Sequence, residues 1–341
     1  MRAASAPRTQ PHSERLLVID PGAGTFADRR ILELPRLTHP GDVWVVNDAA
    51  TLPASLVISP ELELRLVAQE DERTFWALAF GSGDARVPTE QRALPPPLPV
   101  GTTLRFGEEL SARVVAVDAH SARLIAIRFE QSDARLWQGL YRAGRPIQYA
   151  YLSRPLALWD VQNGYASRPW AFEMPSAGRP LSFELLFGLE RAGAEVLRLT
   201  HAAGISSTGD SALDRRLPIP ERYEIPRASA ERVSLARARR SRVVAVGTSV
   251  TRALESAELG GHRAGVAELL LGPGYRPRVV SGILSGMHEP NTTHFSLLEA
   301  FAPRGLLEAS FAHAERAGYL EHEFGDACLI LPGALSSTEC G

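Results

Sequence analysis

The stretch VAVGTSVTRALESA combines residues that bind anions with a junction between a strand and a helix. The run SRVVAV before it is β-branched and apolar, whereas VTRALESAE has helical spacing and strong helix formers. Gly247, Thr248 and Ser249 are therefore expected at the junction, where free backbone N–H groups lie beside two hydroxyls. With Arg252 one turn further on, this junction suits a carboxylate or a phosphate. The alternative is a helix cap with a structural ion pair between Arg252 and Glu255.

Polar residues also stand next to the other strands that the sequence predicts. In an α/β protein, side chains at strand ends converge on one edge of the sheet, where ligands bind. The groups are Asn47-Asp48, Pro175-Ser176-Ala177-Gly178, Thr200-His201, His288-Glu289 with Asn291-Thr292-Thr293, and Glu323-Phe324-Gly325-Asp326. Each group taken singly is also typical of a cap or a loop. Together they predict a polar pocket that contains arginine, histidine and carboxylates.

Composition excludes several kinds of chemistry. All 37 basic residues among the 341 are arginines, so a P-loop lysine, a Schiff-base lysine and a lysine general base are excluded. The nine histidines show no metal-ligand spacing, and neither a GxSxG elbow nor a complete dinucleotide fingerprint occurs. The net charge of −2 leaves RNA contact to a local patch. The arginines of residues 227–242 are the candidate, against a solvated helix face as the alternative.

The elements that must position these residues follow two different sequence patterns. After MRAASAPRTQPHSER, which is typical of a disordered leader, ERLLVID, RRILELPRL and HPGDVWVVND predict short opening strands. Within residues 53–147, LELRLVAQ, RTFWALAF, TTLRFG, ARVVAVDA and RLIAIRFE predict a small antiparallel barrel.

From about residue 148, helices and strands alternate. SFELLFGLERAG, VTRALESAE, NTTHFSLLEAFA and FAHAERAGY predict helices, and EVLRLTHAA, SRVVAVGTS, AELLLGPGY, RVVSGILS and DACLILPG predict strands. This alternation favours a parallel sheet or barrel in an α/β domain formed by residues 1–52 and 148–341, with residues 53–147 inserted. The two cysteines, Cys328 and Cys340, fit a reducing cytoplasm, and no signal peptide or long apolar window predicts secretion or membrane insertion.

In these segments the chain resembles the S-adenosylmethionine:tRNA ribosyltransferase-isomerases of queuosine biosynthesis. LPRLTHPGDVWVVND is similar to the family's LPGDLLVLND segment, and VAVGTSVTRALESA to its VGTTSVRxLES motif. LLLGPGYRPRVVSGILSGMHEPNTT resembles PGYxFxxVDxLxTNFHxPxST, and GYLEHEFGDACLIL resembles YxFxSxGDAMLIL. The motifs follow one another in the family's order over most of the chain. The resemblance implies a distorted α/β barrel with an inserted small antiparallel β-barrel.

The resemblance also implies a reaction in which S-adenosylmethionine donates its ribosyl group. A base removes the C5′ proton that the sulfonium acidifies, adenine leaves, and the amine of a 7-aminomethyl-7-deazaguanine base in tRNA attacks. Ring closure then expels methionine and forms epoxyqueuosine. The implied catalytic residues are His201, Glu221 and His288, and the implied substrate-binding residues are Asn47, Asp48, Ser176, Gly178, Thr248, Ser249, Arg252 and Asp326. We expect a cytoplasmic monomer that needs no metal and enters no membrane.

Departures from the family pattern are concentrated in the loops. Residues 47–55 lack both arginines of NDTRVxPAR, and residues 175–183 lack the histidine of PTAGLHF. Residues 216–225 replace both histidines of HxMHxExxxI but keep Glu221, and His201 is kept in the segment that matches THVGxGTF. Two alternatives therefore stay open. One is an S-adenosylmethionine-dependent enzyme with a different, small-molecule acceptor, and the other is a catalytically inactive S-adenosylmethionine-binding paralogue.

Overall fold

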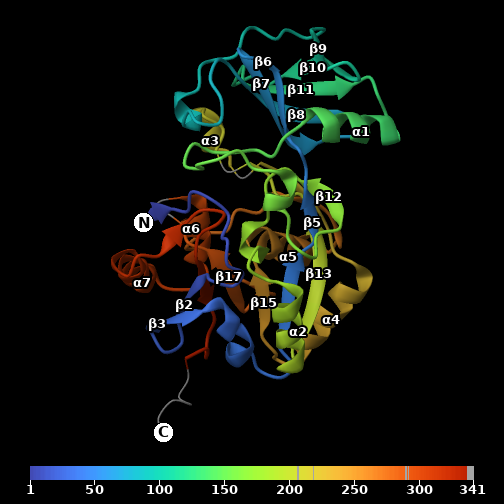
Figure 1. The fold of residues 1–341 in the computed structure, drawn as a ribbon. Helices are drawn as coiled ribbons and strands as arrows, with labels where there is room; N and C mark the ends of the chain where they lie inside the picture. The colour runs from blue at the N-terminus through green and yellow to red at the C-terminus, as the bar shows by residue number, and fades with distance from the viewer. Residues whose placement is uncertain (206, 218, 289, 291, 336–341) are drawn as a thin grey trace.

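Two sheets organise the chain in a computed structural model that describes residues 1–205, 207–217, 219–288, 290 and 292–335. The smaller sheet lies above the larger one in Figure 1. Between them, a two-stranded parallel pair joins β5 (Ala49–Thr51) to β12 (Arg168–Ala171). A second parallel pair joins β1 (Arg2–Ala3) to β18 (Leu320–Glu321).

The smaller sheet has six strands, all of them antiparallel to their neighbours. Their order across the sheet is β6 (Ser55–Ser59), β7 (Leu62–Gln69), β8 (Thr74–Phe80), β11 (Leu124–Phe129), β10 (Leu110–Val117) and β9 (Thr103–Phe106). The edge strands β6 and β9 contact each other, so the sheet nearly closes around a core with Leu64, Phe75 and Ile127. The predicted small antiparallel, barrel-like sheet is therefore confirmed.

The larger sheet has nine strands and is mixed. Their order is β16 (Ala264–Ala267), β14 (Glu221–Glu224), β13 (Glu195–His201), β4 (Val43–Asn47), β15 (Val243–Val246), β17 (Gly282–Gly286), β19 (Ala327–Ile330), β2 (Arg15–Asp20) and β3 (Thr25–Arg30). Strands β13, β4, β15 and β17 are mutually parallel, whereas β19 runs antiparallel to β17, and β14, β16 and β3 are also antiparallel to their neighbours. The predicted α/β class is confirmed, but the sheet is not the parallel one expected. Its closure into a distorted barrel stays a prediction.

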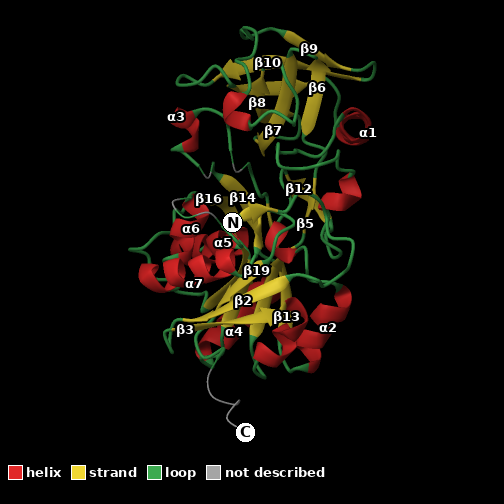
Figure 2. Cartoon of the chain, turned by 60° about the vertical axis from the view of Figure 1, so that its left-hand side comes forward, coloured by secondary structure: helices red, strands yellow, loops and turns green. Residues whose placement is uncertain are grey.

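Helices cover both faces of the larger sheet, as Figure 2 shows. The α-helices are α1 (Asp133–Ala143), α2 (Phe183–Arg191), α3 (Ser211–Asp214), α4 (Arg227–Ala238), α5 (Thr248–Gly260), α6 (Thr293–Leu298) and α7 (Arg304–Arg316). Side chains alternate across a strand, so Trp44 and Val46 of β4 pack with α2. Val43 and Val45 of the same strand pack with α4 and α5 on the opposite face.

Three predictions about local structure are wrong. Residues 268–275 form no strand, because Gly272, Pro273 and Gly274 interrupt the pattern and the backbone leaves the sheet after Ala267. Ile31–Leu37 is a short 3₁₀ helix rather than a strand. The leader is ordered, since β1 pairs with β18 and Arg8 donates to Asp326 Oδ1 at 2.6 Å.

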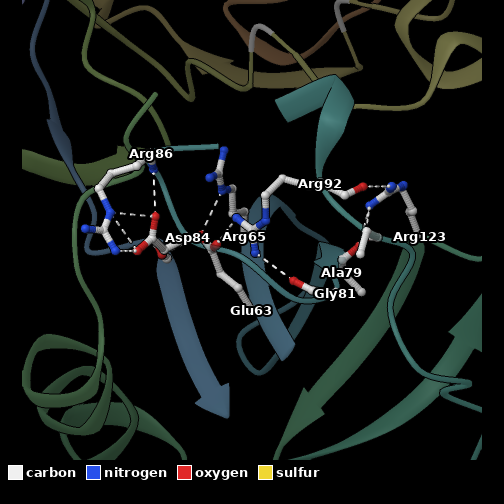
Figure 3. A network of polar contacts seen from close by, with 10 residues as sticks. Glu63, Arg65, Ala79, Gly81, Asp84, Arg86, Arg92 and Arg123 are labelled. Atoms are coloured by element: carbon white, nitrogen blue, oxygen red, sulfur yellow. Dashed lines mark hydrogen bonds and ion pairs between the residues drawn. The ribbon is translucent and has the colours of Figure 1, made fainter. Parts of the chain in front are cut away.

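A buried charge network fastens the segment that crosses from β8 to β9. Glu63 accepts hydrogen bonds from Arg65 Nε at 2.8 Å and from Arg92 Nη1 at 2.7 Å (Figure 3). Arg92 also donates to the carbonyl of Gly81, and Arg123 donates to the carbonyl of Arg92. Because the network ties β7 to the crossing segment, it holds that segment against the barrel-like sheet.

Candidate functional site

The predicted strand-end residues gather at one edge of the larger sheet. The parallel strands β4, β13, β15 and β17 end at this edge, and the antiparallel β19 begins there. Strand β4 continues from this edge through β5 toward the six-stranded sheet (Figure 1). The candidate site therefore faces the smaller sheet.

Asn47 joins the ends of three neighbouring elements. Its Nδ2 donates to the carbonyl of His201 at 2.9 Å and its Oδ1 accepts from the backbone N–H of His201 at 2.9 Å. Nδ2 also lies 3.5 Å from Ser249 Oγ, in the first turn of α5. Asn47 is only 1% exposed, so it fixes the ends of β4 and β13 and the start of α5 relative to one another.

His201, Glu221 and Arg252 form a buried cluster at this edge, on the side of β13 and β14. Arg252 Nη1 pairs with Glu221 Oε2, and His201 Nε2 lies 3.5 Å from the same oxygen. Gly204 donates its backbone N–H to the other carboxylate oxygen of Glu221. Neither ring nitrogen of His201 has a hydrogen-bond partner within the part of the chain that the structure describes.

Burial shifts the proton equilibria of this cluster. Desolvation, reinforced by the nearby Arg252 guanidinium, lowers the pKa of His201 to about 3. His201 is therefore neutral near pH 7, and the same shift makes its imidazole a weak proton acceptor. Desolvation raises the pKa of Glu221, and the charge of Arg252 opposes that rise.

Arg252 is buried as expected, but its partner is not the one that the structural alternative named. Its Nε donates to the carbonyl of Leu269 at 3.1 Å, and its Nη2 donates to that of Ala267 at 2.7 Å. Glu255 instead accepts from Tyr275 Oη and from three consecutive backbone N–H groups of residues 278–280. The Arg252–Glu255 pair is thus wrong, because the two side chains leave α5 toward different loops.

His288 lies half-buried just past the end of β17. Its Nε2 is 2.8 Å from Ser285 Oγ, and its ring stacks on that of His294 with centroids 4.8 Å apart. Desolvation, with His294 and His322 nearby, lowers the pKa of His288 well below 6.5. The structure thus places an uncharged imidazole beside Ser285.

A cavity of about 240 Å³ opens at the same edge, where β17 meets β19. Ser176, Ser285, His322 and Asp326 are among the residues that line it. Asp326 is 3% exposed and accepts from Arg8 and from the backbone N–H groups of Arg15 and Leu320. The predicted residues Ser176 and Asp326 are thus brought together.

The remaining predicted residues contact other parts of the protein or lie in the first turn of α5. Asp48 accepts from Thr200 Oγ1 at 2.6 Å and from Ser167 Oγ at 2.8 Å. A Cβ added to Gly178 would lie 2.0 Å from Tyr165 Oη, so close packing requires glycine there. Thr248 and Ser249 lie half-buried in the first turn of α5. Glu289 and Asn291 lie outside the described residues.

Sequence reasoning missed the leader residues at the site. Arg8, His12 and Glu14 line the cavity together with Arg179. The signal was available in part, since these three charged or titratable side chains precede β2 without an apolar run. No pattern in the sequence shows that this segment returns to the sheet edge.

The arginines of residues 227–242 behave mainly as an ion-paired surface. Arg227, Arg232, Arg237 and Arg242 pair with Glu231, Glu195, Glu258 and Asp42, respectively. Within the described ranges, no helix is long and apolar enough to cross a membrane. The same residues include no group of three or more His, Cys, Asp or Glu side chains suited to a metal ion.

Comparison with known proteins agrees with the motifs. The family model described as "Queuosine biosynthesis protein" matches residues 1–330. The S-adenosylmethionine:tRNA ribosyltransferase-isomerase of Gloeobacter violaceus is 34% identical, over 97% of this chain and 93% of its own length. The enzyme of the same name from Methylorubrum extorquens is 32% identical, over 96% and 93%.

A solved structure extends the similarity to the fold. The crystal structure of the S-adenosylmethionine tRNA ribosyltransferase from Thermotoga maritima matches with a TM-score of 0.53 at 23% identity, and the match covers 96% of both chains. The two chains therefore share a fold over nearly their whole length. With the family's motifs placed at one edge of its sheet, this chain belongs to the S-adenosylmethionine:tRNA ribosyltransferase-isomerase family of queuosine biosynthesis.

Proposed function

We propose that the protein transfers the ribosyl moiety of S-adenosylmethionine to a 7-aminomethyl-7-deazaguanine base in tRNA and isomerises it, forming epoxyqueuosine. The observation that carries this proposal is the similarity over at least nine-tenths of both chains to relatives that are named for this activity. Adenine and methionine are the leaving groups, and the bond formed joins the ribose-derived carbon to the amine of the base. The reaction would take place in the cytoplasm.

The buried cluster supplies a proton acceptor for this reaction. Glu221 stays a carboxylate because Arg252 pairs with it, while burial raises its basicity. His201 is uncharged, and both of its ring nitrogens are without partners in the described structure. We assign the removal of the C5′ proton to Glu221, with Arg252 orienting the carboxylate and the neutral His201 beside it.

His288 supplies a second group that can move a proton. Its Nε2 shares a hydrogen bond with Ser285, whose side chain also lines the 240 Å³ cavity. An imidazole at that place can donate a proton to the departing adenine once it has been protonated. Asn47 would act through the positions of His201 and Ser249 rather than through the substrate.

Residues 53–147 form, in this proposal, an inserted β-barrel domain that helps to hold the tRNA over the site. At the junction of the two sheets, the guanidinium carbons of Arg168 and Arg222 lie 4.1 and 3.6 Å from the centroid of the Trp170 ring. Such a group offers positive charge to a phosphate and an aromatic edge to an unpaired base. Arg168 also pairs with Glu224, but this group combines its charge with an aromatic ring beside the site, which the arginines of residues 227–242 do not.

The test is to incubate the purified protein with S-adenosylmethionine and to follow adenine and methionine by mass spectrometry. One reaction contains tRNA with the 7-aminomethyl-7-deazaguanine base, a second contains tRNA with guanine at that position, and a third contains no tRNA. Release that requires the modified base supports the proposal. Release that ignores tRNA would favour the small-molecule alternative, and absence of release in all three would favour the inactive paralogue.

A further inference from the structure

The 240 Å³ cavity holds charged groups that the proposed proton transfers do not use. Its size is below the roughly 300 Å³ at which pockets for whole drug-sized ligands begin, so it suits one arm of a larger molecule. The lining includes Glu14 and Arg179, which lie far apart in the sequence, together with Ser176 and Ser285. These side chains define what the cavity can recognise.

Glu14 is a buried carboxylate that lacks a counterion. Its side chain lines the cavity, the residue is 7% exposed, and Oε2 has no hydrogen-bond partner in the described structure. Its carboxylate also makes no ion pair with any described residue. Burial of an unpaired carboxylate is costly unless a cation or a hydrogen-bond donor meets it. Glu14 therefore indicates a cationic ligand group.

Arg179 provides the opposite charge in the same cavity. Its Nε makes a long hydrogen bond of 3.4 Å to the carbonyl of Asp160, and it forms no ion pair with a described residue. Arg8, the neighbouring guanidinium, is already paired with Asp326. Glu323 also lines the cavity without an ion pair to any described residue, but it accepts a hydrogen bond from Tyr151 Oη. Arg179 is near enough to Asp160 to contribute to the lowered pKa of that carboxyl, yet makes no ion pair with it. Glu14 and Arg179 therefore remain as the set that matches the ammonium and carboxylate of an α-amino acid.

The cavity also lies beside His288 and the start of α5, two parts of the proposed site. Ser285 connects its wall to His288, and Ala177 of the wall lies 3.4 Å from where a Cβ on Gly247 would stand, at the start of α5. We propose that this cavity binds the methionyl arm of S-adenosylmethionine, with Glu14 receiving the ammonium and Arg179 the carboxylate. The inference rests on the proposed function. It assigns the carboxylate to Arg179 instead of Arg252, whose donors already serve Glu221 and two carbonyls.

The experiment compares two ligands that share the adenosine and the methylated sulfur. Only the first has the methionyl arm, and with that arm its sulfur is a charged sulfonium rather than a neutral thioether. S-adenosylmethionine and 5′-methylthioadenosine are titrated calorimetrically into the protein with a tRNA transcript that carries guanine and does not react. Glu14→Gln and Arg179→Gln are each expected to weaken S-adenosylmethionine binding by roughly ten- to a hundredfold, because each loses a charge-assisted hydrogen bond. Both variants should bind 5′-methylthioadenosine as the unaltered protein does. Glu231→Gln, on the exposed face of α4, is the matched control and should bind both ligands normally.

Three outcomes overturn the inference. Unchanged S-adenosylmethionine affinity in both variants means that the arm binds elsewhere. An equal loss of affinity for both ligands, in variants with normal thermal unfolding, means that the cavity does not bind the methionyl arm. Tight binding of free L-methionine that depends on Glu14, without any effect of Glu14→Gln on S-adenosylmethionine, would assign the cavity to a free amino acid. Failure of the unaltered protein to bind S-adenosylmethionine or to release adenine would instead contradict the proposed function itself.

Discussion

Arg252 and Glu221 illustrate how a single buried pair limits what each residue can do. Arg252→Met leaves the Glu221 carboxylate buried without its counterion, and we expect a loss of about 3 to 5 kcal/mol in the free energy of unfolding. Adding Glu221→Gln should restore part of that loss, because the uncompensated charge disappears. Urea unfolding of the two single variants and the double variant measures this coupling. Arg227→Met, which breaks an exposed pair, is the control. Additive losses in the double variant would mean that the pair does not form.

His201 gives the same cluster a pH signature. Its pKa is about 3 in the folded protein and 6.5 in an unfolded chain, so only the unfolded state gains a proton as the pH falls below 6.5. The stabilising contribution of neutral His201 is therefore present above pH 6.5 and is lost progressively below it. Glu221 has the opposite slope, since its pKa is raised on folding, but it is present in both proteins compared. The free energy of unfolding, measured between pH 4 and 7.5, should change less with pH for His201→Gln than for the unaltered protein. The same pH dependence for both proteins would show that the pKa of His201 is not lowered on folding.

At the scale of elements, the network around Glu63 carries the connection from β8 to β9. Glu63→Gln leaves Arg65 and Arg92 buried without a neutralising carboxylate, and we expect a loss of about 3 to 5 kcal/mol. The lowered pKa of Glu63, for which desolvation is outweighed by its arginine partners, means that this contribution is present above pH 4.5 and lost as the pH falls through the lower folded pKa. Asp84→Asn, which breaks the exposed pair with Arg86 in Figure 3, should leave the urea midpoint unchanged. Equal changes of the urea midpoint for the two substitutions would show that the buried network stabilises the protein no more than the exposed pair does.

The sequence predicted elements better than it predicted partners, for a physical reason. Short continuous apolar runs such as VWVV and a helix with strong formers such as VTRALESAE depend on local sequence, and both formed where expected. The strand expected at residues 267–275 failed beyond Ala267, because Gly272, Pro273 and Gly274 interrupt its apolar run. Contacts such as Arg8 with Asp326 and Arg252 with Glu221 join distant segments, and neither spacing nor composition encodes them. The edge of the sheet was therefore predictable, but the cavity lined by the leader was not.

At the scale of the whole molecule, the connection from β13 to β14 links the barrel-like sheet to the site, in addition to the passage from β4 through β5. The chain leaves the larger sheet after His201, packs on the smaller sheet, and returns at Glu221. In between, Leu213 and Ile205 pack with Phe80 and Val67, and Asp210 accepts from Ser121 Oγ at 2.6 Å. His201 and Glu221 thus stand at the two ends of a segment that is anchored on the other sheet. A shift of the smaller sheet would move both ends.

Leu213→Ala tests this link. Removing the buried side chain should lower the free energy of unfolding by about 2 to 5 kcal/mol and, because the anchored segment loosens, should also lower kcat for adenine release severalfold. Leu186→Ala is the matched control, since Leu186 of α2 is similarly buried but packs in the core of the larger sheet rather than in this connection. It should lower stability by a similar amount and leave kcat at temperatures well below unfolding unchanged. A similar fall in kcat for both variants would mean that activity follows general stability, and that the docking of the smaller sheet does not set the geometry of His201 and Glu221.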